Sequence, residues 1–79
     1  MEIMKVLVMR TAHLKPDTYQ SIHNNETCAT DLYGVFVWVE TETEHEDLYS
    51  ALSFATKNGC SYVKFDEDGE VMEELKTYK

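Results

Sequence analysis

The strongest strand pattern of the chain, Tyr-Gly-Val-Phe-Val-Trp-Val-Glu at residues 33–40, decides the fold. Its three valines alternate with Phe36 and Trp38, which is the period of two expected for a β-strand. Apolar residues on both faces of this strand predict that both faces are at least partly covered. Gly34 indicates a bulge or a close approach by another segment.

The residues after this strand predict a helix over about 44–57. Thr43, followed three positions later by Glu46, has the spacing of a capping box that begins a helix. Asn58-Gly59 predicts its end, with Gly59 in the left-handed conformation. An apolar stripe at helical spacing runs along the segment and consists of Leu48, Ala51, Leu52 and Ala55.

The segment before the strand predicts one further strand and one further helix. Residues 3–10 are short, β-branched and apolar on both alternating faces, which is typical of a central strand. Pro16 suits the first position of a helix over about 16–25, because its missing N–H has no intrahelical partner there. Residues 26–32 are expected to be an irregular connection.

The C-terminal part predicts a strand over 61–65, with Val63 and Phe65 facing inward, and a turn at Asp66-Glu67-Asp68-Gly69. Residues 70–79 fit either a helix or an extended edge segment, and we favour an extended chain with a turn. The resulting order is β-α-β-α-β plus a C-terminal tail or edge strand. It predicts a single α+β domain over residues 1–79, a two-layer sandwich with two helices on one face of a three- to four-stranded sheet.

Acidic residues are concentrated in the second half of the chain. Residues 40–79 carry a net charge of −7 and residues 1–39 a net charge of −1, within a total of −8. Such asymmetry concerns partners and solubility rather than fold, and it predicts a positively charged partner. The candidate partner-binding residues are Glu40, Glu42, Glu44, Glu46, Asp47, Asp66, Glu67, Asp68, Glu70, Glu73 and Glu74.

Two interpretations of these acids are open. Alternate residues of an extended segment lie about 6–7 Å apart on one face, and DNA carries a phosphate about every 3.4 Å along each strand. A row that begins with Glu40 and Glu42 would then occupy the place of about every second phosphate in a basic groove. The alternative is a solvated face, in which Glu46 and Asp47 complement the positive end of the helix.

Catalytic and metal-binding signatures are weak. His13 is the one candidate for acid–base chemistry, with Thr11 and Asp31 as possible partners, but a histidine after a strand more often hydrogen-bonds to a loop carbonyl. The turn at 66–69 lacks the glycine and glutamate positions of a calcium loop. The histidines and cysteines do not fall at zinc spacing. We therefore expect no cofactor, no metal and no enzymatic activity.

Compartment and ligand class follow from composition. The chain has no apolar run near the ~20 residues that a membrane span needs and no signal-peptide pattern, which predicts a cytoplasmic protein. Cys28 and Cys60 are then expected to be reduced thiols. An acidic surface repels nucleic acid and anionic membranes, so direct binding to either is not expected.

Three stretches of the chain carry a family pattern: Val-Leu-Val-Met-Arg-Thr-Ala-His-Leu (6–14), Tyr-Gly-Val-Phe-Val-Trp-Val (33–39) and Asn-Gly-Cys-Ser-Tyr-Val-Lys-Phe-Asp-Glu-Asp-Gly (58–69). In this order they resemble an uncharacterised bacterial family, the domain of unknown function numbered 5983. The chain departs from the pattern at Arg10, where the family usually has serine, and over 16–32, which is shorter than usual. The resemblance implies no reaction, but it implies a bacterial mobile-element setting. Thr-Ala-His-Leu also resembles the opening of a small anti-CRISPR protein.

Together these observations favour a small acidic, non-enzymatic inhibitor from a mobile element, in the cytoplasm of a bacterial host. Its expected partner is the basic nucleic-acid-binding groove of a host defence complex, either a CRISPR surveillance complex or a restriction enzyme, and one expected mode of binding is mimicry of double-stranded DNA. The alternative is a cytosolic protein–protein interaction module or small subunit with no defence role. A small enzyme that uses His13 is the third hypothesis.

Overall fold

The sheet brings together strands from both ends of the chain. A computed structural model describes residues 3–25 and 28–78, and in these residues the sheet has the order β1-β4-β3-β2. Strands β1 and β4 are parallel, whereas β3 is antiparallel to both β4 and β2. The elements along the chain are β1 (Val6–Arg10), the 3-10 helix η1 (Thr11–His13), α1 (Pro16–His23), β2 (Ala29–Thr30), β3 (Gly34–Trp38), α2 (Glu46–Lys57) and β4 (Tyr62–Asp66).

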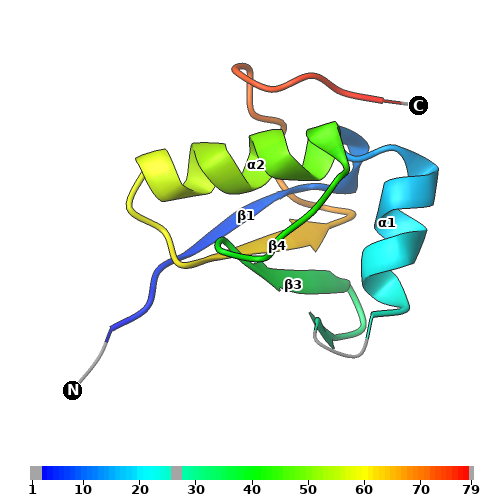
Figure 1. The fold of residues 1–79 in the computed structure, drawn as a ribbon, viewed down its shortest axis with the longest axis horizontal. Coiled ribbons are helices and arrows are strands. Elements are labelled where there is room, and N and C mark those ends of the chain that lie inside the picture. The colour runs from blue at the N-terminus through cyan, green and yellow to red at the C-terminus, as the bar shows by residue number, and fades with distance from the viewer. Residues whose placement is uncertain (1–2, 26–27, 79) are drawn as a thin grey trace.

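The helices and the sheet form two layers around one core. Helix α2 lies along one face of the sheet, and α1 stands across one end of it (Figure 1). The apolar stripe predicted for α2 is buried against the inward residues of the strands, among them Val63 and Phe65. The α+β two-layer architecture predicted from the sequence is therefore confirmed.

Strand β1 differs from the prediction in its place in the sheet. It lies at an edge, and β4 occupies the centre beside it. Leu7 and Met9 point toward the core, whereas Val6 and Val8 are 43% and 42% exposed. Both faces of β1 are apolar, but only one face is covered, so apolar character on both faces did not indicate a central position.

The beginning of α2 also differs from the prediction. The helix begins at Glu46, and the capping box is absent because Thr43 does not cap it. Instead, the Thr43 hydroxyl accepts a hydrogen bond of 3.1 Å from the N–H of His45, in a turn before the helix. The end of α2 agrees with the prediction, since Gly59 follows it with a φ of 77°.

Close backbone packing explains Gly34. A Cβ at this position would collide with the carbonyl oxygen of Phe65 on the adjacent strand. The close approach predicted for Gly34 is therefore confirmed. Residues 31–33 lead into β3 through a turn in which Asp31 Oδ1 accepts hydrogen bonds from the N–H groups of Tyr33 and Gly34.

The C-terminal tail, residues 70–78, is extended with one turn and forms no strand or helix. This agrees with the extended chain with a turn that the sequence analysis favours. Met72 and Leu75 are half-buried against the core, and the N–H of Leu75 bonds to the carbonyl of Met72. Figure 1 shows the tail running past α2 on the side away from β3. The tail is thus part of the folded domain.

Candidate functional site

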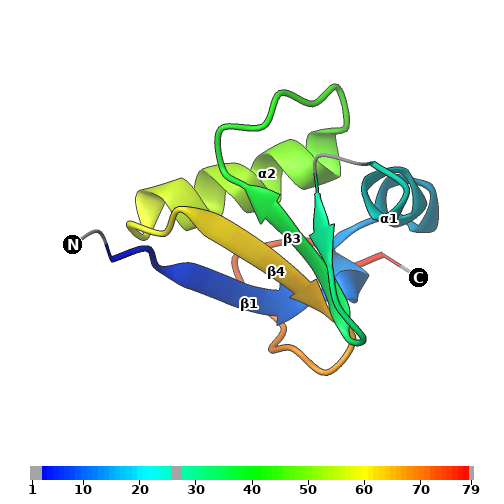
Figure 2. The same cartoon turned by 90° about the horizontal axis from the view of Figure 1, so that it is seen from below.

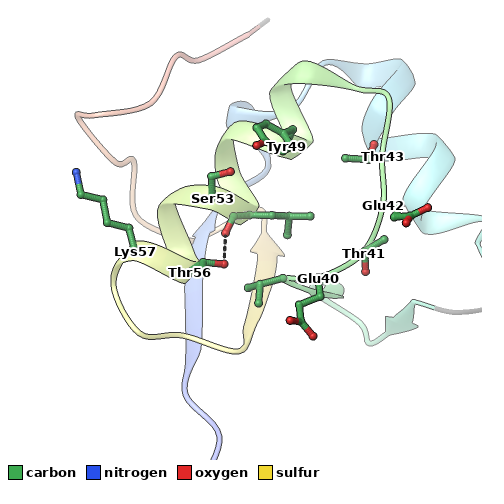
Figure 3. Close-up of a pocket in the computed structure, with 10 residues that line it drawn as sticks. Glu40, Thr41, Glu42, Thr43, Tyr49, Ser53, Thr56 and Lys57 are labelled. Carbon is green, nitrogen blue, oxygen red and sulfur yellow. Dashed lines mark hydrogen bonds between the residues drawn. The ribbon is translucent and has the colours of Figure 1, made fainter.

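The loop between β3 and α2 and one side of α2 enclose a groove of about 600 Å³ (Figure 3). Val39 and Leu52 give it an apolar floor, and Tyr49 stands at its rim with an exposed ring. Thr41, Thr43, Ser53 and Thr56 contribute hydroxyl groups to the lining, and Lys57 contributes one cation. Its volume lies within the range of about 300–1,000 Å³ that small-molecule pockets occupy. Its mixture of apolar floor and hydroxyl walls suits an amphipathic segment.

Acidic side chains surround this groove on the loop side. Glu40 and Glu42 border it, and Figure 3 shows Glu42 directed away from α2, so that the carboxylates form an outer rim. Glu44 and Glu46 continue the acidic surface to the first turn of the helix, and all four residues are exposed. Among residues 3–25 and 28–78, no ion pair involves any of the four. We call these four residues the loop acids.

Asp47 belongs to the predicted partner-binding residues, but it is buried and supports the fold. It is only 7% exposed; Oδ2 accepts a 2.8 Å hydrogen bond from the N–H of Lys15, and Oδ1 accepts one of 3.1 Å from the hydroxyl of Thr18. Burial acts to raise the pKa of Asp47, but these hydrogen bonds outweigh it and hold the pKa below its usual range. Asp47 therefore joins α2 to the start of α1, and we remove it from the residues offered to a partner.

A second acidic group lies at the other end of the sheet. Asp66, at the end of β4, pairs with the first residue of β3, whereas Glu40 follows the last residue of β3. The length of β3 alone separates the two positions by about 13 Å. The members of this group, here called the turn acids, are Asp66, Glu67, Asp68 and Glu70.

Basic residues neutralise part of the turn group. Lys64 Nζ lies 3.0 Å from Asp31 and 3.2 Å from Asp66. Hydrogen bonds from backbone N–H groups and from Lys64 lower the pKa of Asp31, and the two carboxylates in turn raise the pKa of Lys64. Arg10 Nε donates to the carbonyl of Gly69, which places a second cation at the turn. Asp66 is therefore paired, whereas Glu67, Asp68 and Glu70 are exposed and form no ion pair within residues 3–25 and 28–78.

The third group consists of Glu73 and Glu74 in the tail, both exposed. Glu74 borders a hollow with Ser50 and His13, whereas Glu40 and Glu42 border the groove that Tyr49 lines. The predicted carboxylates thus occupy three separate places; within the described residues Asp66 alone among them forms an ion pair, and Asp47 is buried. A single phosphate-like row across residues 40–74 is not formed.

His13 is fully engaged by the backbone of the tail. Its ring is 2% exposed; Nδ1 lies 2.8 Å from the carbonyl oxygen of Lys76, and Nε2 accepts a 2.8 Å hydrogen bond from the N–H of Met72. These contacts fix the neutral tautomer with its proton on Nδ1. The structural role weighed for His13 is confirmed, and neither ring nitrogen is open to a substrate.

Other candidate chemistry is limited in the part of the chain that the structure describes. No group of three or more histidine, cysteine or carboxylate side chains there is arranged to hold a metal ion. No disulfide joins Cys28 to Cys60, and Cys60 packs near the end of α2 with its N–H bonded to Ala55. The helices within these residues are all too short or too polar to cross a membrane.

Sequence reasoning found the acids of the site but not its groove. The signal for Tyr49 was present, because this residue falls off the buried stripe of α2, and it is 64% exposed. Phe54 shows the same sequence signal but packs against the core. The apolar floor had no signal, because it depends on how the loop folds back beside the helix.

Comparison with known proteins places the chain in one family. A family model described as "Family of unknown function (DUF5983) C-terminal domain" matches residues 6–79, so the chain belongs to the DUF5983 family. The resemblance inferred from the three sequence stretches is thereby confirmed at the level of the family. No curated protein and no solved structure matches the chain. The family carries no assigned activity, and the functional argument therefore depends on the site.

Proposed function

We propose that this protein is a non-enzymatic binding module that recognises a basic segment of a partner protein in the groove beside α2. The observation that carries the proposal is the groove in which Val39 and the exposed ring of Tyr49 lie beside the unpaired carboxylates of Glu40 and Glu42. Lysine and arginine side chains combine an apolar stem with a charged head. Such a side chain would lay its stem on the floor and present its head to Glu40 or Glu42.

Electrostatics supports a basic partner from a distance as well as on contact. The net charge of −8 gives a field that attracts cations and accelerates encounter. The loop acids have no ion pair within the described residues that would cancel their part of this field. Tyr49, at the rim of the same groove, is an aromatic side chain of the kind that anchors protein interfaces.

The particular partner that we propose is the basic nucleic-acid-binding groove of a host defence complex, with the protein acting as an inhibitor encoded by a mobile element. Acidity and small size support this target class. The separation of the carboxylates into three groups limits any imitation of DNA to the loop acids. An interaction module with no defence role is the second candidate, and the apolar floor of the groove favours it, because a phosphate mimic needs no such floor.

The first experiment locates the binding site. A fluorescently labelled peptide in which lysine and leucine alternate is titrated with the protein, and anisotropy is recorded at low and high salt. We expect the variant E40Q/E42Q/E44Q to bind about tenfold more weakly, since each exposed pair contributes up to about 1 kcal/mol, and to show a smaller salt dependence.

The matched control is E67Q/D68N/E70Q, which removes the same number of charges from the turn acids. It should weaken binding less than threefold. Equal weakening by both variants would mean that net charge alone drives binding, and the groove would lose its assigned role.

The second experiment tests the target class. DNA binding by purified CRISPR surveillance complexes and restriction enzymes is measured with and without the protein at two salt concentrations. Inhibition that the E40Q/E42Q/E44Q variant loses supports the defence inhibitor. Peptide binding without inhibition of any complex supports the interaction module instead.

A further inference from the structure

The face of the sheet opposite α2 is open to solvent and apolar. Figure 2 looks onto this face, and no described helix or loop crosses it. Val6 and Val8 of β1 are about two-fifths exposed, and Trp38 of β3 is 49% exposed. The strand registers place Tyr62 between Val6 and Trp38 in one cross-strand row, and Lys64 between Val8 and Phe36 in the next. Contiguous apolar surface of this kind marks an interaction site in soluble proteins.

Charge on this open face is balanced, unlike the charge of the molecule as a whole. Its charged side chains are Arg10, Lys64, Asp31 and Asp66, two of each sign. Lys64 Nζ contacts both carboxylates and lies 5.3 Å from the centre of the Phe36 ring. The side chains of Lys64 and Asp66 are already largely removed from water, 16% and 15% exposed, so covering them further costs little additional desolvation.

The open face also has two unlike halves. The β1 side carries the low side chains Val6 and Val8, and the β3 side carries the large rings of Phe36 and Trp38, with β4 between them. A twofold axis parallel to β4 and above it would place the aromatic side of one copy over the valine side of the other. Such an arrangement is isologous, with the same patch used by both copies, and it resembles the aligned packing of two sheets about 10 Å apart.

We propose that the open face binds the same face of a second copy of this chain. Two copies that each carry −8 repel one another, and the electroneutral open face is the surface on which they approach with least repulsion. The strands are only about 17 Å long, so the interface buries less than about 1,200 Å² in total and the dimer is weak. This proposal does not depend on the groove beside α2.

Sedimentation equilibrium over a range of protein and salt concentrations tests the dimer. The dimer fraction should rise with protein concentration and also with salt, because salt screens the repulsion between the copies. Binding of a basic partner in the groove should weaken with salt, so the two interactions are distinguished by the sign of their salt dependence. Concentration-dependent NMR shifts should fall on β1, β3 and β4.

A matched pair of substitutions locates the interface. Val8→Thr changes the open face, and Val71→Thr makes the same change at a valine of similar exposure in the tail. We expect V8T to raise the dimer dissociation constant about tenfold, because in a twofold-symmetric dimer the substitution is present at two places in the interface. V71T should change the dissociation constant less than twofold. Threonine is favourable in strands, and far-UV circular dichroism checks that both variants are folded.

Four outcomes would overturn the proposal. The first is a monomer at every concentration and salt tested, and the second is a dimer that weakens as salt rises. The third is a dimer that V71T weakens as much as V8T does. The fourth is a dimer that V8T leaves unchanged, which would place the interface elsewhere on the molecule.

Discussion

The loop acids and the turn acids are alike in composition but differ in how firmly the backbone around them is held. Each group has four carboxylates within seven consecutive residues or fewer. The turn acids follow β4 directly, beside Lys64 and Arg10, and their backbone is fixed against β1. The loop acids lie in the connection between β3 and α2 and at the first residue of α2, beside a groove that Lys57 also lines. Charge density in a sequence therefore does not tell which carboxylates a partner can reach.

The largest effect that separates the two regions is expected at Gly69. A Cβ there would lie 2.6 Å from the carbonyl carbon and 2.8 Å from the carbonyl oxygen of Met9, backbone atoms of β1 that cannot move aside. Gly69→Ala should lower the free energy of unfolding by about 2–3 kcal/mol, measured by urea denaturation. Thr43→Ala in the loop should cost less than about 1 kcal/mol. Equal losses would show that the turn is no more fixed than the loop.

An intermediate effect is expected at Asp47, the acid that follows the loop acids but serves the fold. Asp47→Asn removes charge-assisted hydrogen bonds to Lys15 and Thr18 and should lower the free energy of unfolding by about 1–3 kcal/mol at neutral pH. Glu44→Gln, at an exposed neighbouring position, is the control and should have little effect.

The pH dependence of Asp47→Asn gives a sharper form of the same test. The pKa of Asp47 is lowered in the folded state, so the unfolded state binds more protons in acid. The stability that it contributes is present above the ordinary carboxyl pKa of about 3.9 and is lost as pH falls toward the lower folded value. In chemical denaturation between pH 6 and 2, the wild-type chain should lose its advantage over Asp47→Asn across this acidic range. A constant difference would contradict this role.

The smallest effect on stability is expected from the loop acids themselves. The E40Q/E42Q/E44Q variant should unfold within about 0.5 kcal/mol of the wild-type chain, because these side chains are exposed and unpaired among the described residues. Thermal denaturation at low and high salt measures it. A loss of more than about 1 kcal/mol would show that the loop acids support the fold, and it would weaken their assignment to a partner.

Local patterns predicted the elements well because local physics forms them. The alternation in β3, the buried stripe of α2 and Gly59 act over a few residues, and each behaves as expected. Gly34 also behaves as expected, but through a contact with Phe65, which is distant in sequence. Strand β2 was missed because it has only two residues and is held by its pairing with β3. The edge position of β1 was missed because the sequence pattern of an apolar strand face is the same whether protein or water covers that face.

The site was predicted less completely than the fold, for a physical reason. Whether a carboxylate is free depends on contacts that are distant in sequence, such as Lys15 with Asp47 and Asp31 with Lys64. The role of His13 likewise depends on the tail, whose bonding atoms lie 59 and 63 positions away. From the sequence, only the position of His13 after a strand was available to predict its role.

The parallel pairing of β1 with β4 has a consequence for how the domain folds. The partner of Val6 is Tyr62, and that of Arg10 is Asp66, so β1 has no neighbour in the described sheet until residues 62–66 have joined it. Closing so long a loop is slow compared with forming helices. Folding of this domain is therefore expected to be nearly all-or-none.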